Sequence, residues 1–270
     1  MQDNFGLFLG RLLEFTVSSN TNAIIIAAGL GSRLSPYTDL TPKCMLDFAG
    51  KTMLQRQIEA YRACGITDIS VVRGHMADRI NLPDLTYFEN SDYANNNILN
   101  SLFYAEPVIR GETICGYSDI LFDANVPAAL LASEHDISIV VDTDWKCYYE
   151  GRIDHPIGEA ENVIFDANGM VISLGKHLTL DDDVDGEFIG MFKLSARGAE
   201  LFKGHFHKMK AAHWNKPFQK AAVFQKAYIT DMFQSLVDDG HPVHCVTIRQ
   251  GWKEIDTVED YQKAVEALQG

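Results

Sequence analysis

The stretch NAIIIAAGLGSRLSPYTDLTPKCML, residues 22–46, decides the fold. It begins with an unbroken apolar run at 23–28, which predicts a strand buried on both faces. A turn containing Gly29 and Gly31 follows this run directly. Such a turn at the carboxyl end of a strand presents backbone N–H groups that bind phosphate oxygens. The stretch therefore indicates an α/β protein with a phosphate site at one edge of its sheet.

Helix-like and strand-like segments alternate through the first half of the chain. Hydrophobic spacing and stop signals predict helices at 53–64, 98–105 and 126–133. Short apolar runs predict strands at 69–72, 85–88, 113–115 and 137–141. Because this alternation is typical of parallel crossover connections, we predict a Rossmann-like, mostly parallel mixed sheet flanked by helices.

The pattern changes between residues 142 and 194, where aromatic residues, turns and short strands dominate. The turn DANG, 166–169, separates strand-like runs at 162–165 and 170–174, and 180–186 is an acidic loop. Later segments predict helices at 196–210, 228–237 and 258–268, with a strand at 243–248. We therefore expect one domain over 22–270, with an inserted substrate-side subregion at about 142–194.

Residues 1–21 form an N-terminal extension with an apolar patch. They lack a basic start, and Gly10, Arg11 and Glu14 interrupt the patch, so we expect neither a signal peptide nor a membrane span. One face of a short helix fits the apolar residues of the patch, and a loose extension is the alternative; these residues are Phe5, Leu9, Leu12 and Leu13.

Composition restricts the class of protein. The chain has 270 residues, of which 46% are hydrophobic, enough for a substantial core. A net charge of −14 argues against binding to nucleic acid or an anionic membrane. Phosphates must then be held by local donors or by a divalent cation. Five widely spaced cysteines without a C-x-x-C pair favour a reduced, cytoplasmic location.

Two common phosphate motifs do not fit. The dinucleotide fingerprint needs a third glycine, and Leu34 stands in its place. The P-loop needs a glycine where Met45 lies, although Gly50, Lys51 and Thr52 supply its second half. The glycine turn therefore belongs to another pattern.

The order A-A-G-x-G-S-R-L-x-P-x-T, followed by P-K, resembles the signature of the nucleotidyltransferases that make sugar nucleotides and related activated phosphate esters. The residues that carry it are Ala27, Ala28, Gly29, Gly31, Ser32, Arg33, Leu34, Pro36, Thr38, Pro42 and Lys43. The resemblance implies that the backbone of the turn wraps the phosphates of a nucleoside triphosphate. Arg33 and Lys43 are then the catalytic cations, on the leaving pyrophosphate and on the α-phosphate respectively.

Two aspartates far apart in the sequence are expected to hold a metal. Asp119, in GYSDILF, follows a predicted strand, and Asp256, in GWKEID, follows the last one. In the resembling family an aspartate at each place binds the metal, so the resemblance implies an Mg²⁺ site here. The usual Gly-Asp is Ser-Asp in this chain. An ordinary turn or helix-cap role is the alternative for each aspartate.

A second series of motifs narrows the resemblance. Asn90, Tyr93, Asn97 and Ser101 have the spacing N-x-x-Y-x-x-x-N-x-x-x-S. With SLGKH and DGEFIGMFKLS, this series resembles the branch of CTP:phosphocholine cytidylyltransferase and the CTP-using enzymes that activate phosphonates. The resemblance implies that CTP is the nucleotide and that Gly74, Asn97 and Ser101 lie near its base and ribose. Helix capping by Asn97 and a strand end at Gly74 are the alternatives.

The acceptor needs groups of its own. Lys176 and Arg152 are expected to bind its phosphate or phosphonate group. Trp145 belongs to an aromatic cluster that fits either an ammonium group or plain core packing. Glu187 is a further candidate for an ammonium group, together with Glu159 and Glu161. No histidine shows a pattern that assigns it a catalytic role.

We therefore expect an Mg²⁺-dependent cytidylyltransferase that transfers CMP from CTP to a small phosphonate or phosphate monoester and releases pyrophosphate. Acceptors of this type are 2-aminoethylphosphonate, 2-hydroxyethylphosphonate and phosphocholine. The alternatives are a sugar-1-phosphate nucleotidyltransferase using UTP or dTTP, and a non-catalytic nucleotide-binding regulatory subunit. We expect no nucleic acid or membrane partner, and a homodimer is left open.

Overall fold

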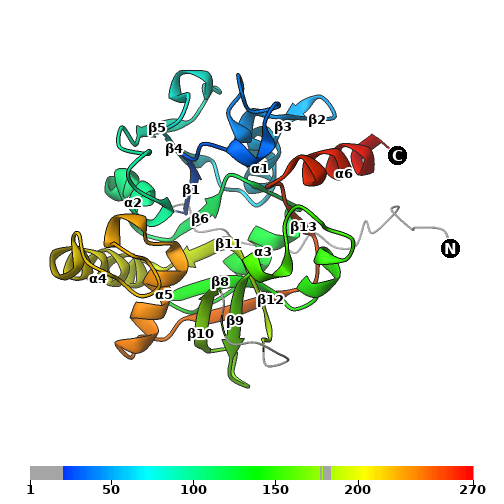
Figure 1. The fold of residues 1–270 in the computed structure, drawn as a ribbon. Helices are drawn as coiled ribbons and strands as arrows, with labels where there is room; N and C mark the ends of the chain where they lie inside the picture. The colour runs from blue at the N-terminus through cyan, green and yellow to red at the C-terminus, as the bar shows by residue number, and fades with distance from the viewer. Residues whose placement is uncertain (1–20, 177, 179–183, 270) are drawn as a thin grey trace.

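The structure, a computed structural model, describes residues 21–176, 178 and 184–269 (Figure 1). At its centre is a nine-stranded sheet, in which β1 (Asn22–Ala27) is buried at every position. β1 pairs in parallel with β4 (Asp68–Arg73) and with β6 (Thr113–Tyr117), and β4 pairs in parallel with β5 (Thr86–Glu89). The buried parallel strand that the apolar run predicts is confirmed.

The other half of the sheet is built around β11 (Gly186–Leu194), which runs antiparallel to β6. β11 also pairs with β8 (Ile137–Asp142) and β9 (Glu161–Phe165). Beyond these lie β12 (His244–Ile248), parallel to β8, and β10 (Val171–Lys176), antiparallel to β9. The expected α/β class, with a mixed sheet whose core strands are parallel, is confirmed.

β11 is an exception in the segment 142–194, where the sequence predicts mostly short strands. This strand has nine residues, and all of them are buried. A strand buried on both faces shows no polar–apolar alternation, so its sequence does not indicate where the strand begins and ends. Segment 142–194 therefore supplies strands to the main sheet itself.

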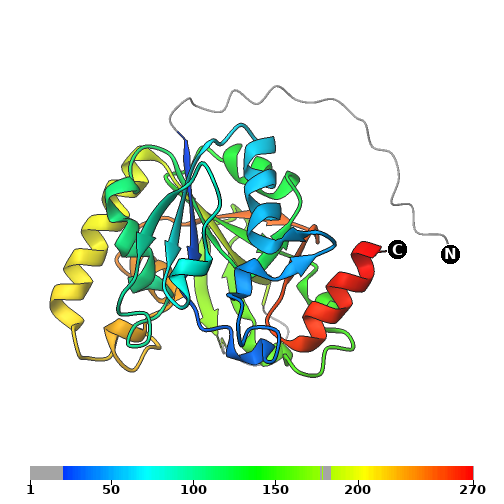
Figure 2. The same cartoon turned by 90° about the horizontal axis from the view of Figure 1, so that it is seen from above.

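Helices cover both faces of this sheet (Figure 2). One face packs against α1 (Met53–Ala63) and α3 (Asn125–Leu131), and the other against α4 (Ala196–His213) and α5 (Ile229–Asp238). Successive residues of β1 serve opposite faces: Ile25 joins the cluster of α1, and Ile24 and Ile26 join that of α4. The two-residue period of a strand thus produces both halves of the core.

The segment Gly50-Lys51-Thr52 forms a turn and a helix start. β2 (Asp47–Phe48) pairs with β3 (Lys51–Thr52), and Thr52 then caps α1. The Thr52 hydroxyl accepts from the N–H of Gln55 at 3.1 Å, while the Gln55 side chain accepts from the N–H of Thr52 at 2.7 Å. This capping box explains the P-loop-like residues without a phosphate.

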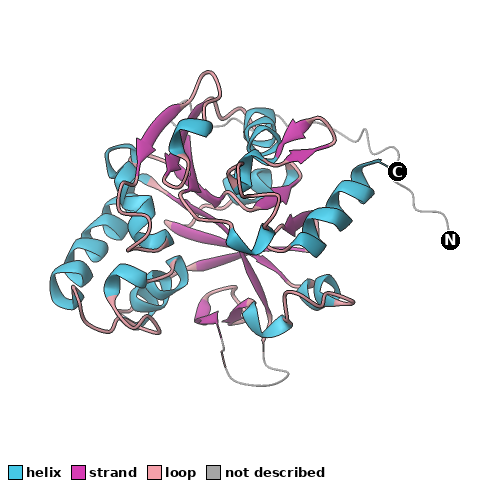
Figure 3. Cartoon of the chain, turned by 45° about the horizontal axis from the view of Figure 1, so that its top comes forward, coloured by secondary structure: helices cyan, strands magenta, loops and turns pink. Residues whose placement is uncertain are grey.

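Two very short strands position the carboxylates that the sequence predicts as metal ligands, Asp119 and Asp256. β7 (Ile120–Phe122) pairs antiparallel with β13 (Trp252–Glu254). Asp119 immediately precedes β7, Asp256 lies just beyond β13, and the N–H of Ile255 donates to the carbonyl of Asp119 at 2.8 Å. The chain then continues into α6 (Val258–Gln269), which packs on the β2–β3 hairpin (Figure 3).

The remaining elements are short. The predicted helix 98–105 is divided into α2 (Ile98–Leu102) and the 3₁₀ segment Phe103–Val108, which contains Pro107. Further 3₁₀ turns span Ser32–Leu34, Lys43–Met45, Ala77–Arg79, Trp145–Tyr149, Ile157–Glu159 and Phe224–Lys226.

Two expected features lie outside the described residues. They are the N-terminal patch with Phe5, Leu9, Leu12 and Leu13, and most of the acidic loop, including Asp181, Asp182 and Asp183. Among the residues that are described, none of the helices combines the length and the apolar character that crossing a membrane requires.

Candidate active site

A cavity of about 590 Å³ lies at the carboxyl end of β1. Its walls come from the turn after β1, the 3₁₀ turn Lys43–Met45, the start of α2, the β6–β7 connection and β11. Ligands in open α/β sheets bind at this edge, because the parallel strands end there together. Five predicted nucleotide-binding residues of the turn line the cavity: Ala27, Ala28, Gly29, Gly31 and Ser32.

The turn needs glycine at position 31. Gly31 has φ of +65°, and a Cβ atom there would lie 3.0 Å from the Cβ of Lys43. The Thr38 hydroxyl donates to the carbonyl of Gly31 at 2.9 Å. Positive φ and close approach together require glycine, so this residue brings the turn against Lys43.

Lys43 joins the two aspartates that the sequence assigns to a metal. Its Nζ donates to Oδ2 of Asp119 at 3.0 Å and also pairs with Oδ1 of Asp256. Arg33 pairs with the other oxygen of Asp256, Oδ2. The expected convergence of Asp119, Asp256 and the two cations is present.

Electrostatic interactions keep Lys43 and Asp256 charged. Burial lowers the pKa of Lys43, but the carboxylates of Asp119 and Asp256 more than offset this, and its pKa is raised above the ordinary value. Burial alone raises the pKa of Asp256, yet the Lys43 ammonium and Arg33 bring it down to about 2. At neutral pH Lys43 is therefore a cation and Asp256 a carboxylate, joined as an ion pair in the site.

The donor set fits a hard divalent cation. Oδ1 of Asp119 is buried and has no hydrogen-bond partner among the described residues. A buried carboxylate oxygen needs a partner, and Mg²⁺ prefers carboxylate oxygens together with substrate phosphates. Asp119 and Asp256 are the residues that would hold Mg²⁺, in place of the ammonium group that lies between them.

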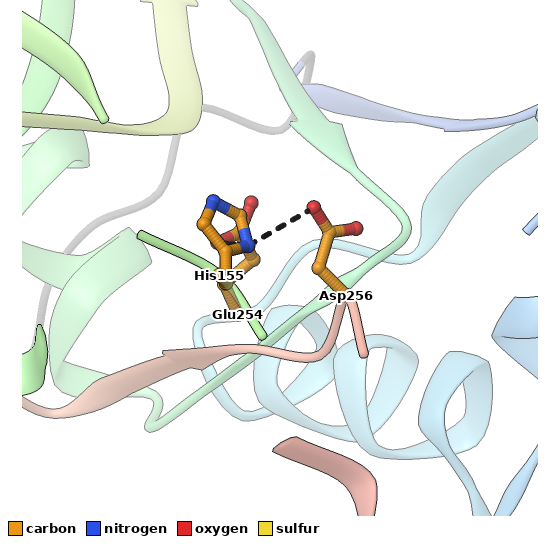
Figure 4. Close-up of side chains that lie close together, drawn as sticks. All are labelled: His155, Glu254 and Asp256. Atoms are coloured by element: carbon orange, nitrogen blue, oxygen red, sulfur yellow. Dashed lines mark ion pairs between the residues drawn. The ribbon is translucent and has the colours of Figure 1, made fainter. Parts of the chain in front are cut away.

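His155 and Glu254 also lie beside Asp256, and the sequence analysis assigned neither (Figure 4). Nδ1 of His155 is 3.5 Å from Oδ2 of Asp256 and 3.6 Å from Oε2 of Glu254. Burial, followed by the charge of Arg152, lowers the pKa of His155 to about 4, so the ring is neutral. Arg152 and Arg33 oppose a second cation here, and we assign no metal to this group.

No local sequence motif identifies His155 as a site residue. It stands near Arg152 in the loop EGRIDHP, about 100 residues before its carboxylate partners. The Arg152 guanidinium donates to Nδ1 of His155 at 3.2 Å. Only the tertiary contact shows that this ring belongs to the site.

Three predicted residues do not line the cavity. Arg152, 3% exposed, is turned to α6 and binds Asp260 through two bonds of 2.7 and 2.9 Å, so its fork is not free for an acceptor phosphate. Trp145 is buried against Tyr149 and Ala160. At Gly74 a Cβ atom would lie 2.7 Å from the carbonyl oxygen of Ala28, so its role is close backbone packing.

Asn97 and Ser101 do line the cavity, although their side chains already have partners. The Asn97 side chain accepts from the N–H of Ile98 at 2.9 Å and donates to the carbonyl of Lys226 at 3.1 Å. The Ser101 hydroxyl accepts from the amide of the buried Asn90 at 2.9 Å. Both residues therefore shape the wall and the start of α2 at once.

The other end of the cavity is rich in carboxyl groups. Lys176 pairs with Glu159 at 3.1 Å and lies 5.4 Å from the ring centroid of Tyr228. Burial raises the pKa of Glu161 to about 7 and that of Glu187 to about 8. Fold and site together define an α/β protein in which a glycine turn at the carboxyl end of β1 faces the clustered carboxylates of Asp119 and Asp256.

Comparison with known proteins agrees with this class. Residues 23–150 match the family model of the MobA-like NTP transferase domain. Over 258 residues the chain is 30% identical to CTP:phosphoglutamine cytidylyltransferase of Campylobacter jejuni, covering 91% of this chain and 99% of that protein. It is 28% identical over 167 residues to 2-aminoethylphosphonate cytidylyltransferase of Lancefieldella rimae, covering 59% of this chain and 62% of the relative.

A solved structure shows the same fold. CTP:phosphocholine cytidylyltransferase from Streptococcus pneumoniae superposes with a TM-score of 0.69 at 20% identity, over 92% of this chain and 99% of that one. The chain belongs to the MobA-like NTP transferase family and is a nucleotidyltransferase. The expected resemblance to the branch of CTP-using cytidylyltransferases is confirmed.

Proposed function

We propose that this protein is an Mg²⁺-dependent cytidylyltransferase that transfers CMP from CTP to a small phosphate- or phosphonate-bearing acceptor and releases pyrophosphate. The observation that carries the proposal is the convergence of Arg33, Lys43, Asp119 and Asp256 at a cavity lined by the glycine turn. The two relatives named above are cytidylyltransferases, which supports CTP as the nucleotide.

The chemistry follows from charge. An acceptor phosphate or phosphonate oxygen is already an anion when it attacks the α-phosphorus in line, so no general base is needed. Backbone N–H groups of the turn bind the triphosphate, and Arg33 binds the leaving pyrophosphate. Lys43 stabilises charge that develops at the α-phosphorus. Mg²⁺ held by Asp119 and Asp256 would neutralise phosphate charge.

The experiment is a pyrophosphate-release screen of CTP, UTP, dTTP and ATP against five acceptors, with and without Mg²⁺. The acceptors are phosphoglutamine, 2-aminoethylphosphonate, 2-hydroxyethylphosphonate, phosphocholine and glucose 1-phosphate. We expect release with CTP, Mg²⁺ and an acceptor other than the sugar phosphate. Asp119→Asn and Asp256→Asn should each lower the rate about 10²–10³-fold.

Asp123→Asn is the matched control, because Asp123 directly follows β7 at the opposite end from Asp119 and does not line the cavity. Its rate should stay within about twofold of the parent rate. Release with UTP or dTTP and glucose 1-phosphate would instead establish the sugar-nucleotide alternative. Tight CTP binding with no release for any acceptor would establish the regulatory alternative.

A further inference from the structure

Glu187 has an unusual environment at the acceptor end of the cavity. It lies in β11, is 4% exposed and lines the cavity. Oε1 accepts a hydrogen bond from the Tyr149 hydroxyl at 2.6 Å. Oε2 is buried and has no hydrogen-bond partner among the residues that the structure describes. A carboxyl oxygen buried in this way is strongly disfavoured unless something binds it.

Glu161 lies on the neighbouring strand β9, and it is close enough for its charge to contribute to the raised pKa of Glu187. It is 8% exposed and also lines the cavity. Its hydrogen bonds are long: Tyr117 donates to Oε2 at 3.4 Å and Thr230 donates to Oε1 at 3.3 Å. The wall therefore carries two buried carboxyl groups with incomplete hydrogen bonding.

The charges that line the cavity also favour a ligand that carries a cation. Its lining has more carboxyl groups than cations: Asp119, Glu159, Glu161, Glu187, Glu254 and Asp256 against Arg33, Lys43 and Lys176. Each of the three cations forms an ion pair with an aspartate or with Glu159. Among the described residues no ion pair involves Glu161 or Glu187, so these two are the carboxyl groups available to a cation on a ligand.

The same wall carries the rings of Tyr117, Phe188 and Tyr228. Aromatic faces exclude water and attract cations, which strengthens a carboxylate–ammonium bond. The unpartnered Oε2 of Glu187 needs a partner, and a primary ammonium offers three N–H groups. The positive charge of the ammonium also favours the ionised form of this carboxyl, which burial otherwise disfavours. A quaternary ammonium has no N–H group and cannot make this bond.

We propose that Glu187, assisted by Glu161, forms a subsite for a primary ammonium group on the acceptor. The inference rests on the proposed function and adds the substrate class: a small phosphate or phosphonate that also carries a primary amine. The charged N–H donates to Oε2 of Glu187, while the Tyr149 hydroxyl holds Oε1 in place.

The test uses 2-aminoethylphosphonate and 2-hydroxyethylphosphonate, which differ only by an ammonium in place of a hydroxyl. With CTP and Mg²⁺, we expect the parent protein to favour the amine at least about tenfold in kcat/KM. Glu187→Gln should bring this ratio close to one while changing kcat/KM for the hydroxyl compound less than about threefold. Phosphocholine should be a poorer acceptor than 2-aminoethylphosphonate.

Two further variants make the result specific. Glu161→Gln should reduce the preference partly, because it removes charge but not the direct contact. Glu59→Gln, on the exposed side of α1, should leave the ratio unchanged. Because the measured quantity is a ratio between two substrates of one variant, a general loss of folded protein does not alter it.

The outcomes separate this inference from the proposed function. Turnover of both phosphonates with equal kcat/KM in the parent protein overturns the ammonium subsite and leaves cytidylyl transfer intact. No turnover with any acceptor overturns cytidylyl transfer, and calorimetric binding of the two phosphonates then decides the subsite. Tighter binding of the amine that is lost in Glu187→Gln supports it, and equal binding overturns it.

Discussion

Lys43 occupies the place where a divalent cation is expected. Its ammonium lies between Asp119 and Asp256, and Oδ1 of Asp119 has no hydrogen-bond partner among the described residues. The positive charge compensates two carboxylates that would otherwise repel each other across the cavity. Lys43 and a divalent cation would therefore compete for the same oxygens, and with metal and triphosphate bound Lys43 would be free to contact the α-phosphate.

This competition predicts that one substitution weakens catalysis and strengthens metal binding. Lys43→Met should lower CMP transfer about 10²–10³-fold, because the transition state loses a charged contact. The same variant should bind Mn²⁺ several-fold more tightly without nucleotide, because the competing ammonium is gone. Free Mn²⁺ is measured directly by electron paramagnetic resonance, and pyrophosphate release gives the rate.

Lys51→Met is the control for this prediction, since Lys51 pairs with Glu59 on the surface and does not line the cavity. Both of its readouts should match those of the parent protein. Unchanged or weaker Mn²⁺ binding in Lys43→Met would show that the ammonium does not compete with the metal.

The start of α6 acts as a support for Asp256. Oδ2 of Asp260 accepts hydrogen bonds from the N–H groups of Asp256 at 3.1 Å and Thr257 at 2.8 Å. Arg152, from the loop after Trp145–Tyr149, holds both oxygens of Asp260 and lies 3.2 Å from Glu254. Arg152 is therefore a positioning residue that connects segment 142–194 to Asp256, the predicted metal ligand.

Arg152→Lys tests this connection while keeping the charge. A lysine ammonium cannot reproduce the planar fork that holds both oxygens of Asp260, so the backbone of Asp256 should become less fixed. We expect the Mg²⁺ concentration for half-maximal turnover to rise about three- to tenfold, with kcat changed less than about threefold.

Lys263→Ala on the same helix is the matched control, because Lys263 bonds Glu259 and the carbonyl of Gly151 but not Asp260 or Asp256. Its Mg²⁺ dependence should equal that of the parent protein. An unchanged Mg²⁺ dependence in Arg152→Lys, at equal thermal stability, would remove Arg152 from the support of the site.

At the scale of the molecule, one continuous sheet connects the nucleotide side to the acceptor side. β11 pairs with β6 of the parallel half and with β8 and β9 of the other half. One large cluster of buried residues includes Ile24 of β1, Val163 of β9 and Phe233 of α5. Shared strands and a shared core cannot separate without exposing apolar surface common to both.

We therefore predict a single cooperative unfolding transition. The calorimetric and van't Hoff enthalpies should agree, and far-ultraviolet circular dichroism should follow the same curve as tryptophan fluorescence. Trp145 reports on the acceptor-side segment and Trp252 on β13, so the fluorescence signal covers both sides. Two resolved transitions would show instead that segment 142–194 unfolds as a separate unit.

Sequence alone determined the parts of this protein that are encoded locally. A continuous apolar run followed by a glycine turn predicts a buried strand, and α1 has its capping residues beside it in the chain. The paired glycines, Arg33 and the later Pro42-Lys43, in this order after the buried strand, were sufficient to indicate the family. The residue types at the site follow from the charge of a triphosphate.

Only the tertiary structure decided which distant residues meet. β7 and β13 have three residues each, too few for any periodic signal, yet their pairing brings Asp119 to Asp256 and leaves His155 and Glu254 beside them. The tertiary structure also directs Arg152 away from the cavity to Asp260. It leaves Oε2 of Glu187, which lines the cavity, without a hydrogen-bond partner among the described residues. Pairing between strands and burial of charge depend on long-range contacts, and a local pattern carries no record of them.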